Sequence, residues 1–594
     1  MWPFLLLFTG CSEPQTTPEA EIQPTAEATA VPPQDPTSSG PPTVNPSLTF
    51  KPPTVSEPTP TPLASPTSFA EPPRRFSGPP LARTLPALPI QKSLQSARIT
   101  LLQTQIARYK LFAAYRELIT LNKNAGLYDE AARLARAQAT QYRAKGLQDA
   151  AIIADNEAGS LESQLRVFLE TRPSAVAAAD RTTSAANEPV TGCYLGAFID
   201  RDDSLGEPFW EEDRTQWHRA PEQWMDATGR HPGSLFTYLS YGQPFPRAWA
   251  YRLKAQGTIP QIAWEPTTSK KYSANTRSLP QIRDDAYLRE FARQLREFDF
   301  PVFIRFASEM NGFWTHPQYG WNGDARLYRE KFRLVHRVLH EVAPRVATIW
   351  CVNNPPLGNA FDYYPGDDGC DWVGLNFYAV PYHEDKINKP AFDENPLALL
   401  DPVYKRFAAR KPIAICEFAA SHQARVDPRP IPDFAISKLR LVYGALPLLY
   451  PRVKLVDWFN MNTLRYATKD KTPNDYLLTD DKRVLRAWQD VTSNRHFLQT
   501  YLQLGEIIPP VYRPFGNQKI SEPTQVGIWA KNFGADGTVF LGIDGQGWTK
   551  ARAGGATYLP FEPRALGRGF HTLSALLYDA KKRFQKRVDL RFST

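Results

Sequence analysis

Two glutamates lie where apolar, strand-like segments end. Glu309 comes shortly after the apolar run FPVFIRFA, and Glu417 lies within PIAICEFAAS. A charged side chain in a buried strand is costly unless a site uses it. Two facing carboxyl groups can hydrolyse a glycosidic bond, one as general acid/base and one as nucleophile, and a separation of about 5–5.5 Å gives retention of configuration. The competing interpretation is a structural ion pair with Arg305.

The elements that must position these glutamates are parallel strands. From Cys193 to about Leu504 the chain alternates strand-like and helix-like blocks, and most strand-like blocks are apolar throughout, as in parallel sheets covered on both faces. Eight such units over about 310 residues predict an α/β fold, the (β/α)8 TIM barrel. The rival, a doubly wound open sheet, lacks a glycine-rich phosphate loop here. The expected strands are 193–199, 233–242, 258–266, 301–309, 346–354, 371–379, 412–420 and 453–462.

Active sites of such barrels lie at the carboxyl ends of the strands, where Glu309 and Glu417 are expected to converge. The segment RFASEMNGFW (305–314) resembles glycoside hydrolase family 26, whose typical form has Arg, then His-Glu-Met-Asn-Gly, then Trp. LGAF, AWEP, WCVNNP and DWVGLNFY support the resemblance, which covers roughly residues 190–500. The resemblance implies a retaining β-glycosidase with Glu309 as acid/base and Glu417 as nucleophile.

The resemblance also implies roles for residues around the two glutamates. Tyr378, at the end of the sixth strand, would hydrogen-bond the nucleophile. Trp314 would stack on a sugar, and Trp458 would form part of the floor under the sugar at the cleavage point. Ordinary loop packing for Trp314 and a core role for Trp458 are the alternatives. Glu265 and Asn353 are expected to contact the substrate.

Two residues close to Glu309 in the sequence affect its expected role as acid/base. Arg305, four residues before Glu309, is expected to face the barrel interior and hold a carboxylate in place. Ser308 stands where the family usually has His, a residue that helps to shape the subsite at the cleavage point, so substrate choice or rate differs here. The WEP sequence at the third strand resembles mixed-linkage β-glucanase members more than mannanases, and both substrates stay open.

The flanking regions differ in composition. MWPFLLLFTGC (1–11) resembles a bacterial lipoprotein signal with Cys11 as the acylated residue, although a plain secretory signal is the alternative. Residues 12–90 hold 21 of the 55 prolines and predict a disordered Pro/Thr-rich linker. Residues 91–172 have helical spacing and predict an α-helical region for packing or a protein partner. A second linker (173–190) follows, the barrel spans 191–504, and residues 505–594 predict an immunoglobulin-like β-sandwich.

Composition excludes several function classes. The net charge of +9 is dispersed rather than clustered, which argues against a nucleic-acid partner. The nine histidines show no HxH or HExxH spacing, so neither a catalytic metal nor a cofactor is expected. No segment predicts a transmembrane helix. Cys351 and Cys370 could form a disulfide if the protein is exported.

The sequence therefore predicts an exported, lipid-anchored glycosidase of the bacterial cell envelope, or a secreted one. Its polysaccharide substrate is β-1,4-mannan by family resemblance, with endo-action, while mixed-linkage β-1,3-1,4-glucan and an exopolysaccharide are the alternatives. An alternative of another class is a non-catalytic surface lipoprotein that binds glycan. Retention of both glutamates argues against that reading.

Overall fold

The computed structural model describes most of the chain from Leu94 onwards. The predicted signal with Cys11, the linker 12–90 and residues 173–184 of the second linker lie outside the described residues. None of the described helices is long and apolar enough to span a membrane. The described residues are 94–124, 128–162, 165–171, 185–268, 275–392, 394–466, 473–501, 508–531, 537–552, 554–579, 582 and 584–594.

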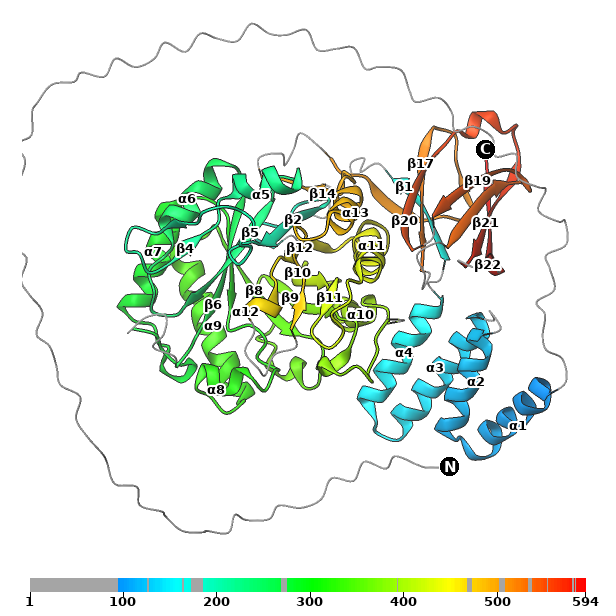
Figure 1. The fold of residues 1–594 in the computed structure, drawn as a ribbon, viewed down its shortest axis with the longest axis horizontal. Coiled ribbons are helices and arrows are strands. Elements are labelled where there is room, and N and C mark those ends of the chain that lie inside the picture. Colours follow the sequence, from blue (N-terminus) through cyan, green and yellow to red (C-terminus); the bar gives the residue numbers. More distant parts are fainter. Residues whose placement is uncertain are drawn as a thin grey trace, which may run out of the picture. The chain divides into compact units, whose positions relative to one another are not determined.

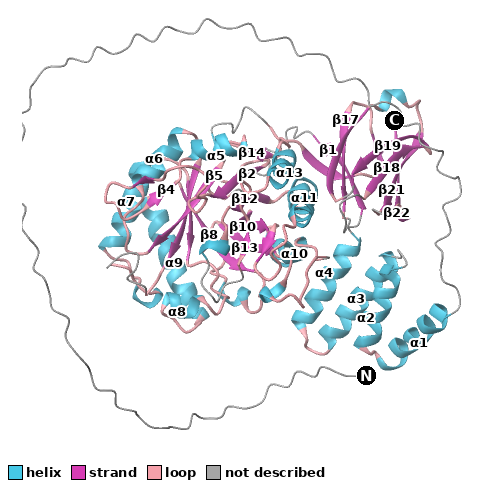
Figure 2. Ribbon diagram, viewed as in Figure 1, coloured by secondary structure: helices cyan, strands magenta, loops and turns pink. Residues whose placement is uncertain are grey.

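Eight parallel strands form a closed barrel (Figures 1 and 2). Successive strands pair in chain order, and the last barrel strand pairs with the first, which closes the sheet on itself. This confirms the predicted barrel. The strands are β2 (Cys193–Phe198), β5 (Ser234–Ser240), β6 (Ile259–Glu265), β7 (Val302–Phe306), β8 (Val346–Asn353), β9 (Trp372–Ala379), β10 (Ile413–Ala420) and β12 (Val453–Phe459).

Burial explains why these strands carry few polar side chains. Every residue of β2, β7, β8, β10 and β12 is buried, because side chains alternate between the barrel interior and the surrounding helix layer. A polar residue inside one of these strands therefore needs a partner or a function. Each expected strand is present, and the observed ends differ by up to three residues from the predicted ones.

Amphipathic helices cover the outside of the barrel. The first residues of α7 and α9 are capped by Asp285 and Asp324, whose carboxylates accept backbone N–H groups of the first turn. The covering helices are α5 (Pro221–Thr228), α6 (Arg247–Ala255), α7 (Ala286–Phe298), α8 (Thr315–Tyr319), α9 (Ala325–Val342), α10 (Leu397–Phe407), α11 (Pro432–Leu449), α12 (Thr463–Tyr466) and α13 (Lys482–Thr492).

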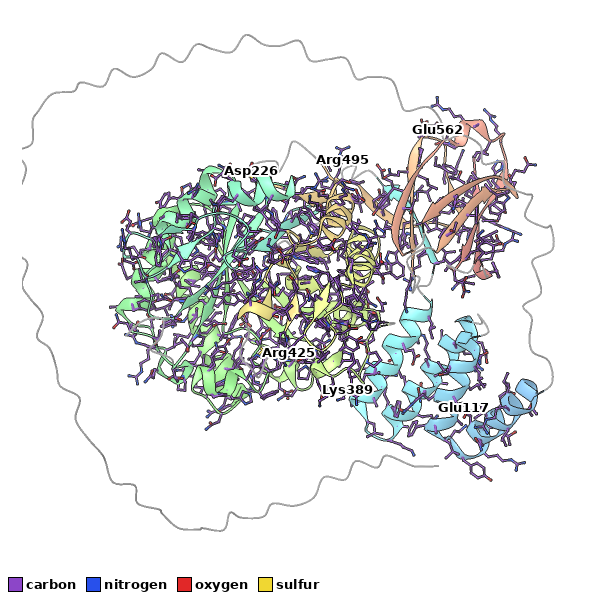
Figure 3. The ribbon with its side chains drawn as sticks, in the orientation of Figure 1. Glu117, Asp226, Lys389, Arg425, Arg495 and Glu562 are labelled. Atoms are coloured by element: carbon purple, nitrogen blue, oxygen red, sulfur yellow. The ribbon has the colours of Figure 1, made fainter. Side chains whose placement is uncertain are left out.

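The helical region consists of four helices with a small apolar core of its own. Arg98 on α1 donates hydrogen bonds of 2.7 and 2.6 Å to Glu117 on α2, which Figure 3 labels. The core contains alanines that let the helices approach closely, among them Ala131 and Ala135. The helices are α1 (Leu94–Tyr109), α2 (Phe112–Asn124), α3 (Tyr128–Ala144) and α4 (Gln148–Glu162).

One segment assigned to the helical region is a strand instead. β1 (Leu165–Thr171) pairs antiparallel with β15 (Val511–Pro514) and with β17 (Thr524–Ala530). Alternate residues Leu165, Val167 and Leu169 are buried in the core of the C-terminal sheets. The helical prediction for this segment is wrong because its period is two, and its strand partners lie more than 300 residues further along the chain.

The C-terminal region contains two sheets that share one apolar cluster. The first sheet has the order β15-β1-β17-β20 and the second has the order β16-β22-β21-β18-β19. The immunoglobulin-like assignment for this region stays a prediction. The remaining bounds are β16 (Gln518–Lys519), β18 (Thr538–Ile543), β19 (Gln546–Arg552), β20 (Gly555–Phe561), β21 (Phe570–Tyr578) and β22 (Phe584–Ser593).

The barrel cysteines are free thiols. The predicted disulfide between Cys351 and Cys370 is wrong, since both side chains are buried and unpaired as cysteines. Cys351 lies inside β8, with Sγ 3.2 Å from Oδ1 of Asn376. Cys370 precedes β9, where its sulfur lies 3.7 Å from the carbonyl oxygen of Gly366.

Candidate active site

Glu309 lies on a tight turn after β7 rather than in the strand itself. β7 ends at Phe306, and the turn has positive φ at Ala307 (45°) and at Glu309 (58°). Such conformations cost energy for residues other than glycine, and they cluster at functional sites. The turn is nevertheless held in place, because the N–H of Glu309 donates to the carbonyl oxygen of Cys351 at 2.9 Å. The hydroxyl of Tyr319 also donates to the carbonyl of Ser308 at 2.7 Å.

Glu417 lies at a β-bulge. The pairing of β10 with β9 shifts register between Ile415 and Glu417, so that Glu417 lies opposite Asn376. Bulges beside active sites re-aim a side chain. The Glu417 side chain is buried, yet it reaches groups from three other strands, which are described next.

Arg305 and Asn376 connect the two glutamates. Nη1 of Arg305 lies 2.8 Å from Oε1 of Glu417 and donates to Oδ1 of Asn376 at 3.1 Å. Nδ2 of Asn376 in turn donates to Oε1 of Glu309 at 2.8 Å. The structure therefore brings Glu309, Glu417 and Arg305 together as predicted from their strand ends, and adds Asn376 as the link.

The side chains that donate to Glu309 from the described part of the chain are neutral. Nε1 of Trp314 donates to its Oε2 at 3.0 Å, so the indole edge of Trp314 faces the carboxyl group. Burial raises the pKa of Glu309, and the negative charge of Glu417 raises it further, while the hydrogen bonds from Asn376 and Trp314 act in the opposite direction. A raised pKa keeps a carboxyl group protonated closer to neutral pH, as a general acid requires.

Glu417 receives a charged donor and two tyrosine hydroxyls. Tyr238, on β5, donates to Oε1 at 2.7 Å, and Tyr378, on β9, donates to Oε2. The predicted contact of Tyr378 is present. Tyr238, which has 37% of its surface exposed, was missed by sequence reasoning.

A second buried acid lies inside the barrel. Asp457 is fully buried and accepts a hydrogen bond from Nε2 of Gln261. Burial raises its pKa to about 8, while Gln261 and Arg305 act in the opposite direction. Gly196 makes room for this carboxyl group, because a Cβ there would lie 1.9 Å from Oδ1 of Asp457. Only glycine fits at this position of β2.

Trp458 does not face the mouth of the barrel. Its side chain is 0% exposed, packs against Phe418 and Tyr443, and donates from Nε1 to the carbonyl of Tyr476 at 2.9 Å. The predicted role as a sugar floor is wrong, because successive strand residues point to opposite sides and Asp457 points inward. The next residue, Phe459, contacts Tyr378 instead, with ring centroids 5.5 Å apart.

The two remaining predicted substrate contacts have protein partners. Oε2 of Glu265, the last residue of β6, accepts a hydrogen bond from Nε2 of Gln318 at 2.9 Å and is partly exposed. Asn353 is buried, and its amide donates to the carbonyl of Pro355. Glu265 is thus accessible to a ligand, whereas Asn353 shapes the loop that follows β8.

Asn376 donates a hydrogen bond to Glu309, whose neighbour in the chain is Ser308. The Ser308 hydroxyl lies 3.5 Å from the carbonyl oxygen of Arg305, which is a marginal hydrogen bond. Asn376 is 1% exposed and is flanked in β9 by apolar residues. A buried amide in an otherwise apolar strand is the signal by which sequence reasoning could have found it.

Phe313 adds an exposed aromatic ring to the rim. It is 76% exposed and packs edge-on against Trp314, with ring centroids 5.3 Å apart. Exposed large apolar rings beside a polar site are typical of ligand-binding surfaces.

Part of the barrel is similar in sequence to known proteins. The model of glycosyl hydrolase family 26 matches residues 240–394, which include Glu309 and Tyr378 but end before Glu417. Endoglucanase H of Acetivibrio thermocellus is 23% identical over 254 residues, covering 41% of this chain and 26% of that protein. A β-1,3-xylanase of a Vibrio species is 33% identical over 108 residues, covering 17% and 22%.

Each of these curated matches covers only part of this chain and only part of the relative. The chain spans about a quarter of the length of the curated relatives it matches. A solved GH26 β-mannanase from Bacteroides ovatus is 16% identical, covers 56% of this chain and 96% of its own, and has a TM-score of 0.35, too low to add an argument. The family match and the two glutamates lie in the same barrel, of which residues 240–394 are similar to glycosyl hydrolase family 26.

Proposed function

We propose that the barrel is a retaining, endo-acting β-glycosidase that cleaves a polysaccharide. The observation that carries this proposal is the unequal pair of glutamates. Glu309 has neutral hydrogen-bond donors and a raised pKa, whereas Glu417 is paired with a buried arginine. Retaining hydrolysis needs one carboxyl group protonated and the other ionised at the same pH.

The reaction would run in two displacements. Glu309 donates its proton to the glycosidic oxygen while a carboxylate oxygen of Glu417 attacks the anomeric carbon, which breaks the bond to the leaving sugar. The ionised Glu309 then takes a proton from water, and that water attacks the same carbon and releases Glu417. The positive charge of Arg305 would stabilise the negative charge that returns to Glu417 at the end of each turnover.

The hydroxyls around Glu417 would orient it for attack. Tyr378 and Tyr238 donate to different oxygens of the carboxylate. Oε1 contacts both Arg305 and Tyr238, so one of these donors must withdraw for Oε1 to attack the sugar. Arg305 is fully buried and Tyr238 is exposed, so we infer that Tyr238 is the one that turns away when substrate binds.

The substrate that we propose is β-1,4-mannan, as the family resemblance implies. Mixed-linkage β-glucan and β-1,3-xylan are the competing substrates, because the WEP at the end of β6 resembles the glucanase members and a matched relative is named as a β-1,3-xylanase. Glu265, accessible at the end of β6, would contact the sugar. Phe313 would add a stacking surface at the rim.

The test is hydrolysis of a panel of polysaccharides by the native protein and by Glu309→Ala, Glu417→Ala and a surface control, Glu330→Gln. We expect cleavage of one β-glycan by the native protein and the control, with loss in both active-site variants. Proton NMR of the first product should show the anomer of the substrate. Activity that survives in both variants would contradict the site assignment. Release of the opposite anomer would contradict the retaining mechanism.

The non-catalytic alternative has its own outcome. Tight binding of a glycan without cleavage by the native protein, measured by calorimetry, would favour the surface glycan-binding lipoprotein. Cleavage at the rate of a typical enzyme, on the order of 1–1000 per second, would exclude it.

We also propose that Cys11 anchors an exported protein at the cell envelope, with the Pro/Thr-rich segment as a spacer and the C-terminal sheets as an immunoglobulin-like module. The signal-like sequence supports the anchor. Metabolic labelling with a palmitate analogue should mark the full-length protein and not Cys11→Ser. Equal labelling of both would contradict the anchor.

A further inference from the structure

Two histidines and an aspartate gather on the outer side of the barrel. His336 and His340 lie one turn apart on α9, and Asp371 directly precedes β9 (Figure 1). Nε2 of His340 lies 2.8 Å from Oδ2 of Asp371, and Nδ1 of His336 lies 3.9 Å from the same oxygen. Among the described residues, this is the one group of three such side chains whose ligand atoms all lie within 4.8 Å of one another.

A buried threonine holds the cluster in position. Oδ2 of Asp371 accepts the N–H of Thr348 at 2.7 Å and its hydroxyl at 3.0 Å. The same hydroxyl lies 2.8 Å from Nδ1 of His336, a contact that this nitrogen gives up when it binds an ion. Hydrogen bonds of this kind to ligand side chains orient them in metal sites. The cluster is therefore positioned by β8 and not only by the flexible ends of surface side chains.

We propose that His336, His340 and Asp371 form a binding site for a divalent transition-metal ion of the Zn²⁺ type. Two imidazole nitrogens and one carboxylate oxygen are ligands that zinc takes in proteins, with water as the fourth ligand. Bonds of about 2.0–2.1 Å place the ligands of a tetrahedral ion about 3.3 Å apart. The observed separations of 2.8 and 3.9 Å bracket that value.

The three side chains are partly exposed, so an ion can reach them from solvent. Their exposed fractions are 15% for His336, 32% for His340 and 14% for Asp371. A single carboxylate is a poor site for Mg²⁺ or Ca²⁺, which prefer oxygen ligands, so imidazole selects the softer ions. Nearby positive charges are engaged elsewhere, since Arg333 pairs with Asp368 at 2.6 Å and Lys411 donates to backbone carbonyls.

The location separates this site from the catalytic one. Asp371 and Thr348 lie at the amino ends of β9 and β8, whereas Asn353 and Tyr378 lie at or near their carboxyl ends. The ion would link α9 to two barrel strands and stabilise the fold without entering the reaction. Binding to the folded state alone raises the midpoint of thermal unfolding.

The test uses the full-length protein without a histidine tag, stripped with a chelator and titrated with ZnCl₂ in a calorimeter. We expect one ion per chain, a higher Tm with zinc, and an affinity on the order of 100-fold lower in His336→Ala and in His340→Ala. Co²⁺ should give the visible absorption of a tetrahedral site. MgCl₂ should give no heat of binding.

The matched control is His383→Ala, because His383 also pairs with a carboxylate, Glu394, at 2.7 Å but lies outside the cluster. Circular dichroism of each variant checks the fold. Asp371→Asn keeps the shape of the side chain and should weaken binding as well. Zinc binding that is unchanged in the two histidine variants, or a stoichiometry well below one in the native protein, would overturn the proposal.

Discussion

Glu309 follows β7 and Glu417 lies in β10 of the same barrel, yet the protein surrounds them differently. Glu309 lies on a strained turn, is partly exposed, and accepts from an indole and an amide. Glu417 lies in a bulged strand, is 4% exposed, and contacts a fully buried arginine. The same side-chain type thus meets neutral hydrogen-bond donors in one place and a positively charged donor in the other.

Charge placement, rather than residue type, separates the two glutamates. Arg305 contacts Glu417 directly, whereas its hydrogen-bond link to Glu309 runs through the neutral amide of Asn376.

The largest effect is expected for Glu417→Ala. The variant removes the nucleophile, so kcat/KM should fall on the order of 10⁵-fold or more, with the fold retained. A fluorinated substrate analogue should label the native protein on the peptide that contains Glu417. Labelling on another residue would assign the nucleophile elsewhere.

Glu309→Ala should reduce kcat/KM by about 10²–10⁴-fold for natural polysaccharides. The loss should shrink for aryl glycosides whose leaving group needs no proton. Steady-state kinetics on both substrate types measures the contrast. Equal losses on both would show that Glu309 is not the general acid.

Arg305→Met should weaken activity and stability together. A hydrogen bond to a charged group contributes about 1.5–3 kcal/mol, so kcat/KM should fall roughly 10–100-fold. Breaking a buried pair costs about 3–5 kcal/mol, which urea unfolding would detect. A variant as stable as the native protein would argue against a buried pair.

Asn376→Ala should move the alkaline limb of the pH–rate profile. The amide donor lowers the pKa of Glu309, so its removal raises that pKa and keeps Glu309 protonated to higher pH. The limb should therefore shift upward, with about a tenfold loss in kcat/KM at the optimum. Asn359→Ala, outside the site, serves as the control. A downward shift would contradict the proposed link.

Tyr238→Phe should have the smallest effect. Losing one neutral hydroxyl donor corresponds to about 0.5–1.5 kcal/mol, or roughly a 3–10-fold change in kcat. Because Tyr378 still donates to Glu417, the variant should remain active. Tyr378→Phe provides the comparison at the less exposed hydroxyl, and a larger loss for Tyr238→Phe would reverse the roles inferred for the two hydroxyls.

Much of the barrel could be predicted because local signals mark it. Apolar strands separated by amphipathic helices revealed all eight βα units, and the misplaced charges of Glu309 and Glu417 marked the mouth. The prediction for Trp458 is wrong because a shift of one residue along a strand moves a side chain to the other face of the sheet. The position of a strand end cannot be read to that precision from composition.

Other features depend on contacts that local patterns do not contain. Asn376 acts through Arg305 and Glu309, which precede it by 71 and 67 residues. The cluster of His336, His340 and Asp371 needs the turn before β9 to come back to α9. A search for HExxH passes over it because residue 337 is Arg rather than Glu, although His336 and His340 have the same i, i+4 spacing. The third residue, Asp371, is distant in sequence.

β1 has a consequence for how the protein is made. It lies between β15 and β17 in its sheet, and its Thr171 donates a hydrogen bond to Val511, 340 residues later. At about 5–20 residues per second, the ribosome needs roughly 20–70 s to supply that partner. The whole barrel is synthesised within that interval. β1 must therefore wait, with apolar residues such as Val167 uncovered, until the last part of the chain emerges.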